Sequence, residues 1–339
     1  MKKICKSMIV FVSLILIFNY CTYQESSYGD FDQIIVVADS LFYQSVEPDL
    51  ELAFDQVIYT PHSERSYYLE WSPFEQLKSQ QTRRNILLLG ILNGNDRTSQ
   101  YINRALNDDI RTAVSAGKVF EIFQPEMYAK EQMVIIMIAP DLVSFRENFK
   151  SRSEEIIKRL NLSCFERLER TMFVRGEQID QEDYLRGKYG WKLKIQYDYD
   201  IVLESENGNF VWLRRLKPDR NLFIYRFPAD SMRMESSWLI AKRDSLTSIY
   251  FETDSVLKQD TYIQRTSFDG RPALKMVGVW QNRKYLIGGP FRTYSFYDTD
   301  QKYIYLIDLM VTAPGKRKKP YLDQLEVMAQ SFRLVSKTN

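Results

Sequence analysis

The segment that most constrains the fold is residues 288–315, which reads GGPFRTYSFYDTDQKYIYLIDLMVTAPG. Two β-favouring runs, residues 290–297 and 303–312, flank the polar turn of residues 298–302, which is the pattern of a β-hairpin. The second run is apolar on both of its alternating faces, and such a strand is typical of the middle of a sheet that is covered on both sides. We therefore expect this hairpin at the centre of a sheet.

Hydrophobic patterning divides the chain into two halves. In the first half, apolar strands alternate with helical stretches, the last of which runs from Pro140 to about Phe173, and this predicts a two-layer α/β half. In the second half consecutive strands dominate, which predicts an α+β half: a C-terminal antiparallel sheet flanked by helices. The predicted division is a signal in residues 1–20, a tether in 21–32, an α/β domain in 33–175, a linker in 176–190 and an α+β domain in 191–334.

The N-terminus has the pattern of a secretory signal. Lys2, Lys3 and Lys6 form a positive segment, and the apolar run of residues 8–18 follows it. Cys21 lies where a bacterial lipoprotein signal places the cysteine that is acylated, although the two residues before it are larger than usual. We expect lipidation of Cys21 and a periplasm-facing position in the bacterial cell envelope; the alternative is a plain cleaved or retained signal.

Cysteine and histidine counts exclude several kinds of site. If Cys5 leaves with the signal and Cys21 is acylated, Cys164 is the remaining thiol, so we expect neither an internal disulfide nor a cysteine-based metal site. Cys164 lies on the apolar side of a predicted helix and is expected to be a small buried hydrophobe, with a reactive thiol as the alternative. His62 is the only histidine, and its neighbour Pro61 indicates a loop. No metal or cofactor is expected.

The balance of charges and the lack of phosphate-binding motifs argue against nucleic-acid and nucleotide ligands. Without the three lysines of the signal, the 46 basic side chains fall to 43, one fewer than the 44 acidic ones. A general nucleic-acid binder would be clearly basic, so no nucleic-acid partner is expected. The sequence also contains neither a G-x-G-x-x-G motif nor a P-loop.

Arginines inside apolar strands are the candidate binding residues, because a guanidinium group within a sheet must be paired or reach water. A pocket for a carboxylate, phosphate or sugar would be built from Arg214, Arg292, Trp212 and Tyr294. The structural alternative, which is the favoured one, pairs the arginines with acids of the sheet and thereby fixes strand register. The strand arginines are Arg214, Arg215, Arg226 and Arg292, and the candidate acids are Asp308 and Glu204.

Two further motifs have a structural and a functional interpretation. The pair Gly288-Gly289 is expected to form a β-bulge, and close approach of another backbone is the alternative. The basic run of residues 316–319 is expected to be a solvated loop, with contact to anionic lipid headgroups as the alternative.

The motifs NFVWLRR (residues 209–215) and GGPFRTY (residues 288–294) resemble an uncharacterised family of Bacteroidota lipoproteins, known only as a domain of unknown function. The resemblance implies a cell-envelope location and no known activity, so it assigns no functional residues. The second half is also similar in its order of elements to the Mog1/PsbP-like fold, which is used mainly for protein binding and complex assembly. Similarity of fold does not establish function.

These observations together predict a lipid-tethered binding or assembly module rather than an enzyme. Its expected partners are the membrane, through the N-terminal lipid, and an envelope protein or an anionic ligand. The alternative is a carboxylate-dependent hydrolase of envelope glycans or lipids. The two hypotheses differ in whether Asp and Glu side chains converge in a cleft, or whether the largest cavity is lined by Arg214, Arg292, Trp212 and Tyr294.

Overall fold

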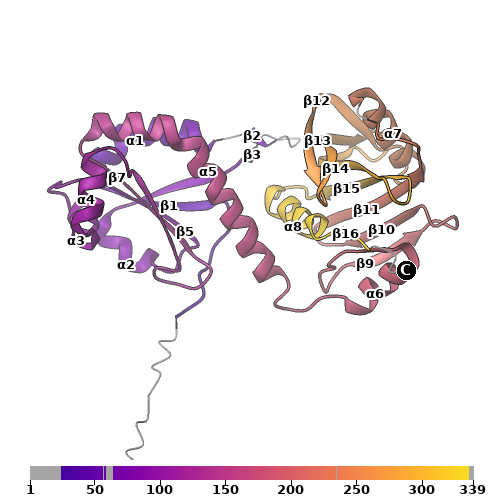
Figure 1. Cartoon of the computed structure of the whole chain (residues 1–339), viewed down its shortest axis with the longest axis horizontal. Coiled ribbons are helices and arrows are strands. Elements are labelled where there is room, and N and C mark those ends of the chain that lie inside the picture. The colour runs from indigo at the N-terminus through magenta and orange to yellow at the C-terminus, as the bar shows by residue number, and fades with distance from the viewer. Residues whose placement is uncertain (1–23, 56, 59–63, 234, 336–339) are drawn as a thin grey trace, which may run out of the picture.

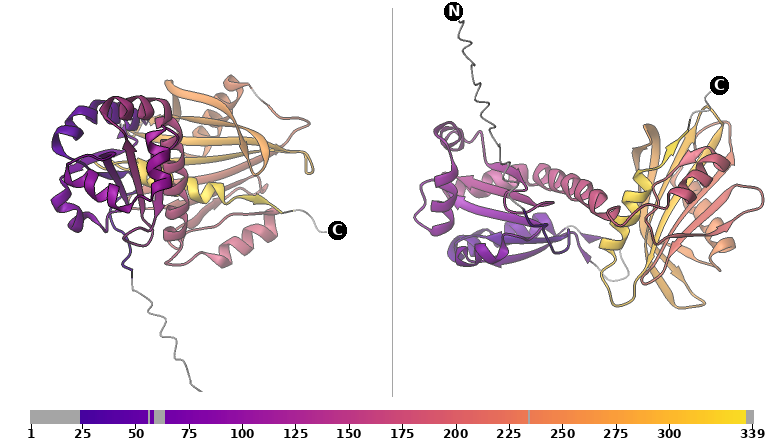
Figure 2. Two further views of the ribbon diagram at one scale, coloured as in Figure 1. Left: turned by 60° about the vertical axis from the view of Figure 1, so that its left-hand side comes forward. Right: turned by 90° about the horizontal axis from the view of Figure 1, so that it is seen from below.

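The structure is a computed structural model that describes residues 24–55, 57–58, 64–233 and 235–335. The signal sequence, Cys21 and His62 lie outside these residues. An N-terminal and a C-terminal region lie side by side, and the long helix α5 (Leu142–Met172) runs from one to the other (Figures 1 and 2). None of the helices in the described part is both long enough and apolar enough to cross a membrane.

The N-terminal region is built on a mixed five-stranded sheet in the order β4-β1-β5-β7-β6. All neighbours are parallel except β6, which runs antiparallel to β7. The central strands are apolar on both faces, as a sheet covered on both sides requires. The strands are β1 (Gln33–Val37), β4 (Tyr68–Ser72), β5 (Asn85–Ile91), β6 (Glu121–Pro125) and β7 (Met133–Ala139).

Helices cover both faces of this sheet. One face packs on α1 (Ser40–Phe54) and the first part of α5, and the other packs on α2 (Leu77–Gln80), α3 (Arg97–Ala105) and α4 (Asp108–Ser115). The α/β class is therefore confirmed, with three layers where the sequence predicted two. The short strands β2 (Val57–Ile58) and β3 (Glu64–Arg65) form a hairpin that extends toward the C-terminal region (Figure 1).

The C-terminal region is built on a seven-stranded antiparallel sheet in the order β12-β13-β14-β15-β11-β10-β9, which confirms the predicted class. Strands β14 (Ile287–Asp298) and β15 (Tyr303–Thr312) form the predicted hairpin, and β15 is the central strand. The other strands are β9 (Asp200–Glu204), β10 (Phe210–Arg215), β11 (Asp219–Pro228), β12 (Ser255–Phe268) and β13 (Arg271–Asn282).

Each face of this sheet has its own apolar core. On the face toward the N-terminal region, the sheet packs on α8 (Lys319–Gln330) and on α6 (Ile179–Tyr189) (Figure 1). On the other face it packs on α7 (Ser236–Tyr250). Helix α6 lies within the predicted linker, and it buries Leu185 and Tyr189 in the C-terminal core. A two-stranded ribbon of β8 (Trp191–Lys192) and β16 (Arg333–Leu334) completes the region.

Helix α5 contributes to the cores of both regions. Its first half buries Phe145 and Phe149 in the N-terminal core, and its last turns bury Leu168 and Met172 in the C-terminal core. Residues 24–32, expected to belong to a tether, lie along the N-terminal region: Ser27 N donates to the carbonyl oxygen of Lys130 at 2.8 Å.

The expected bulge at Gly288-Gly289 is not present, and close backbone approach is the reason for glycine here. Gly289 lies in regular register opposite Trp280. A Cβ atom at Gly289 would lie 1.8 Å from the carbonyl oxygen of Val311 on the neighbouring strand. Any side chain at this position would therefore force β14 and β15 apart.

Candidate functional site

The four residues predicted to form one pocket lie on opposite faces of the C-terminal sheet. Trp212 packs with the core under α7, and Arg214, two residues further along β10, shares its face. Tyr294 packs with the core under α8, and Arg292 shares that face. The structure therefore brings the residues together only in pairs, and the single four-residue pocket is corrected.

Both candidate arginines are paired with carboxylates of the same molecule. Arg214 contacts Asp219 through its Nε and Nη2 atoms at 2.8 and 3.0 Å. Arg292 donates to Glu326 at 2.9 Å and to Asp323 at 3.3 Å. The acids proposed from the sequence have other partners. They are Asp308, which binds Arg243 of α7 at 2.7 Å, and Glu204, which binds Lys188 at 2.7 Å.

The best candidate site is a cavity of about 410 Å³ between the two regions, which we call the junction cavity. It contains Arg292, and both regions contribute to its wall. The N-terminal region and α5 supply Phe31, Ile58, Ser66, Tyr67, Asn161, Cys164, Phe165 and Leu168, and the C-terminal region supplies Tyr262, Gln264, Lys275, Val277, Arg292, Lys319, Leu322, Asp323 and Glu326.

Five charged side chains form a chain of ion pairs along one wall of the junction cavity. Glu326 of α8 pairs with Lys275 of β13 at 3.4 Å and with Arg292 of β14 at 2.9 Å. Asp323, one turn earlier on α8, pairs with Arg292 and with Lys319. The wall thus holds three cations and two carboxylates, an excess of one positive charge.

Burial and neighbouring charges together determine the pKa values of the side chains in this cluster. Burial alone would raise the pKa of the Glu326 carboxyl, but Lys275 and Arg292, together with the hydrogen bond from Tyr294, lower it to about 2. Burial lowers the pKa of Lys275, which Glu326 only partly offsets. An anion that entered the cavity would stabilise the charged form of Lys275, because a nearby opposite charge favours the ammonium form.

A second and larger cavity of about 780 Å³ shares Lys275 and Glu326 with the junction cavity, and its wall holds the carboxylates that the hydrolase alternative would need. Tyr294 lines it, together with four glutamates: Glu169, Glu177, Glu182 and Glu326. Each of these carboxylates has a partner. Lys194 lies 3.7 Å from Glu169 and 4.0 Å from Glu177. Glu182 accepts from the backbone N of Ile195 at 2.7 Å.

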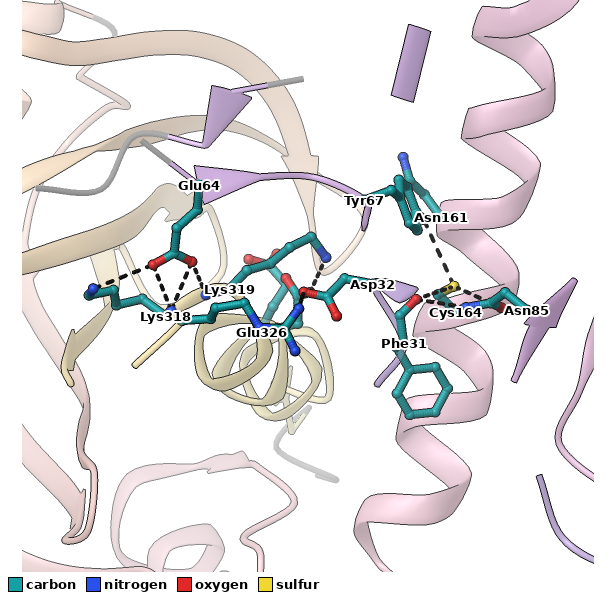
Figure 3. Close-up of polar contacts among 12 residues, drawn as sticks. Phe31, Asp32, Glu64, Tyr67, Asn85, Asn161, Cys164, Lys318, Lys319 and Glu326 are labelled. Atoms are coloured by element: carbon teal, nitrogen blue, oxygen red, sulfur yellow. Dashed lines mark hydrogen bonds and ion pairs between the residues drawn. The ribbon is translucent and has the colours of Figure 1, made fainter. Parts of the chain in front are cut away.

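The basic run of residues 316–319, expected to be a solvated loop, connects the two regions (Figure 3). Arg317 pairs with the buried carboxylate of Asp32 at 2.8 Å and with Asp30. Glu64 of β3 accepts hydrogen bonds from the backbone N–H groups of Lys318 and Lys319 at the start of α8. Lys316, by contrast, is exposed. These contacts join the two regions next to Lys319, which lines the junction cavity.

Cys164 lines the junction cavity and is half-buried. Its sulfur lies 3.3 Å from Arg167 Nη2 and 3.8 Å from Tyr67 Oη, so its surroundings are more polar than predicted. Figure 3 shows the contact with Tyr67. Burial raises the pKa of the thiol, against the opposing effect of Arg167. The thiol is thus half-buried among polar groups, where the sequence predicted a small buried hydrophobe.

Sequence reasoning missed most of the junction cavity. Asp323 and Glu326 could be recognised only as polar positions on the closing helix, and Lys275 as a charged residue in a strand. No group of three or more His, Cys, Asp or Glu side chains within the described ranges is placed to hold a metal ion.

Solved structures resemble the chain only distantly. A protein of Bacteroides thetaiotaomicron is 6% identical, with a TM-score of 0.28, and the match covers 45% of this chain and 47% of that one, about half its length. LpqN of Mycobacterium tuberculosis is 10% identical with a TM-score of 0.28 over 43% of this chain and 83% of its own. The Ran-binding protein Mog1p of Saccharomyces cerevisiae is 9% identical with a TM-score of 0.29 over 43% and 90%.

No curated protein matches the chain. The predicted resemblance to a family known only as a domain of unknown function is confirmed. Bacteroidota origin and lipidation remain predictions. Residues 27–173 match the family described as "Domain of unknown function (DUF8532)" and residues 178–331 match "Domain of unknown function (DUF4837)".

Proposed function

We propose that the protein is a lipid-anchored binding module of the bacterial cell envelope, and that its ligand places an anionic group in the junction cavity. The observation that carries this proposal is the excess of cations on the cavity wall, where Lys275, Arg292 and Lys319 face two carboxylates. A buried anion gains more from such a wall than an exposed one, because screening by water is weak there.

Contact with both regions distinguishes this cavity from an ordinary surface pocket. Tyr67 comes from the N-terminal region, Asn161 from α5 and Lys319 from the C-terminal region. A ligand held by all three would bind best when the two regions are docked. Binding would therefore stabilise that arrangement by mass action.

The charged cluster favours binding over acid–base catalysis. A general acid at neutral pH needs a carboxyl group with a raised pKa. The pKa of Glu326 is instead lowered to about 2, since Lys275 and Arg292 outweigh burial. Glu326 therefore stays ionised and serves to hold the cations in place.

Inorganic phosphate is a suitable first probe of the cavity. With the purified Cys21→Ser chain, we expect phosphate to raise the melting temperature in a saturable way. Lys319→Gln removes one charge-assisted hydrogen bond, so the affinity should fall by about tenfold. Lys316→Gln, which removes an exposed charge of the same basic run, is the matched control and should leave the affinity unchanged. Equal affinities in the two variants, or no saturable shift, would reject the site.

Lipid anchoring is tested separately by fractionation. The unmodified chain should be found in the membrane fraction and extracted by detergent, and Cys21→Ser should move it to the soluble fraction. Replacement of Cys164 by Ser is the control for loss of a thiol and should not change fractionation. Unchanged membrane association of Cys21→Ser would contradict lipidation of Cys21, whatever the phosphate experiment shows.

A further inference from the structure

A separate polar cavity of about 740 Å³ lies in the C-terminal region, beside the ends of α6 and β16. We call it the Arg226 pocket. It lies at the start of β15, whereas the other end of β15 leads into α8 and the junction. Its wall consists of Gly187, Lys188, Tyr189, Gly190, Arg226, Arg271, Asp298, Asp300, Gln301, Tyr303, Leu334 and Val335.

Strand register places the polar groups of this pocket on one face of the sheet. Arg226 of β11 lies opposite Tyr305 of β15, and Asp298 of β14 lies opposite Tyr303 of β15. Tyr303 and Tyr305 are two residues apart on one strand and share a face, and directly opposed residues also share a face. Arg226 and Asp298 therefore flank the same pair of tyrosines.

Arg226 differs from the other strand arginines predicted from the sequence. Arg214, Arg215 and Arg292 each pair with a carboxylate, whereas Arg226 forms no ion pair with a described residue. Its Nη1 atom donates to the carbonyl oxygen of Tyr189 at 2.8 Å and lies 3.5 Å from Tyr305 Oη. Its Nε atom is buried without a hydrogen-bond partner in the described part of the chain.

The partnerless Nε atom of Arg226 belongs to the Nε–Nη2 edge, through which two other arginines of this protein bind a carboxylate at two points. Arg243 binds Asp308 through Nε and Nη2 at 2.7 and 3.2 Å, and Arg214 binds Asp219 in the same way. This two-point geometry matches the spacing of carboxylate oxygens. The guanidinium carbon of Arg226 lies over the rings of Tyr189 and Tyr303, 5.5 and 5.1 Å from their centroids.

Asp298 supplies an acceptor in the same pocket. The residue is 1% exposed, its Oδ1 accepts from the backbone N of Asp300 at 3.1 Å, and its Oδ2 is buried without a partner in the described residues. A buried carboxylate oxygen without a donor is costly. Of the other charges on the wall, Lys188 binds Glu204 at 2.7 Å and Arg271 binds Asp269 at 2.6 Å, while the carboxylate of Asp300 is exposed to solvent.

We infer that the Arg226 pocket binds a small carboxylate that carries a neighbouring hydrogen-bond donor, as hydroxy acids and amino acids do. The carboxylate pairs with the Nε–Nη2 edge of Arg226 between the two tyrosine rings. The neighbouring hydroxyl or ammonium group donates to Asp298. This site is independent of the junction cavity and of the proposed function.

The inference is tested by calorimetric titration of the purified Cys21→Ser chain with three probes: acetate, lactate and alanine. Lactate or alanine should bind at least about tenfold more tightly than acetate, because only they satisfy Asp298. A preference for lactate identifies hydroxy acids as the ligand class, and a preference for alanine identifies amino acids. Absence of binding by all three, or equal affinities for all three, would overturn the inference.

Substitutions of wall residues test whether the probes bind in the Arg226 pocket. Arg226→Gln should abolish binding of all three probes, and Asp298→Asn should reduce lactate or alanine to the affinity of acetate. Arg265→Gln, which removes an exposed arginine of β12, is the control and should have no effect. Because Arg226→Gln could unfold the chain, Tyr303→Leu, which removes one flanking ring, serves as a second variant and should weaken binding about threefold to tenfold. Full binding by the folded variants would contradict the site.

Discussion

The carboxylate of Glu64 accepts hydrogen bonds from the backbone N–H of Lys318 at 2.9 and 2.8 Å, which joins the N-terminal region to the first turn of α8. The start of a helix has N–H groups without intrahelical partners, and α8 has no side-chain cap from its own N-cap residue, Lys318. Glu64 caps this helix from a strand more than 250 positions earlier in the sequence. Docking of the regions and stability of α8 are thus coupled.

Replacing Glu64 by Gln should lower stability by about 1–2 kcal/mol, since a neutral amide is a weaker acceptor for backbone N–H groups at a helix start. Thermal unfolding of the purified chain measures the change. Glu70→Gln, which removes an exposed carboxylate of the neighbouring strand β4, should have little effect. If both variants lose the same amount of stability, Glu64 has no special role in joining the two regions.

The Glu326 cluster predicts a specific loss of stability in acid. The pKa of Glu326 is lowered from 4.5 to about 2, because Lys275 and Arg292 outweigh the effect of burial. A lowered pKa gives a carboxylate a stabilising contribution that is complete above about pH 4.5 and disappears as the pH falls toward 2.

The gap in unfolding free energy between wild type and Glu326→Gln should therefore be about 3 kcal/mol near pH 6 and shrink steadily below pH 4.5. Denaturant unfolding across this range measures it. Glu169→Gln, which removes a half-exposed carboxylate of the adjacent cavity, controls for the loss of one negative charge. A gap that stays constant down to pH 3 would show that Glu326 does not depend on its ionised form.

Asp254 predicts a pH dependence of the opposite sign. Burial raises its pKa from 3.8 to about 6, against the opposing hydrogen bond from Asn282. The raised pKa stabilises the fold fully below pH 3.8, and this contribution is lost as the pH rises through about 6. Asp254→Asn should thus gain melting temperature relative to wild type between pH 4 and pH 7. A melting temperature of Asp254→Asn that falls relative to wild type over this pH range would contradict the burial argument.

Close packing at Gly289 predicts that one added methyl group at this position lowers the stability strongly. Gly289→Ala would place Cβ against the carbonyl oxygen of Val311, and overpacking of this kind costs about 1–3 kcal/mol or more. Gly187→Ala is the matched control. Gly187 lies in α6, and apart from its chain neighbours and the backbone of its own helix no atom lies within 4 Å of an added Cβ. Alanine favours a helix by about 0.5–1 kcal/mol. The two variants should shift the melting temperature in opposite directions, and equal shifts would refute the steric explanation.

Local patterns predicted the elements of the fold well. Residues 303–312 are apolar on both faces, which placed this strand at the centre of a covered sheet, and β15 is the central strand. The three- and four-residue spacing of apolar side chains predicted α5 almost to its ends. These predictions succeed because periodicity along one segment determines which of its faces are buried.

The candidate site could not be predicted in the same way. Alternation within a strand shows that Trp212 and Arg214 share a face, and that Arg292 and Tyr294 do. It does not show whether the two pairs share a face with each other, because this depends on the register of the strands between them. Likewise, nothing local links Asp32 to Arg317, since their contact forms only when the two regions dock.

The central claim is that an anion binds in the junction cavity, and lysine labelling tests it most directly. The purified chain is acetylated with and without inorganic phosphate, and mass spectrometry gives the rate at Lys275, Lys319 and the exposed control Lys316. Phosphate should slow acetylation of Lys275 and Lys319 severalfold and leave Lys316 unchanged. Equal rates with and without phosphate at all three lysines would contradict the claim.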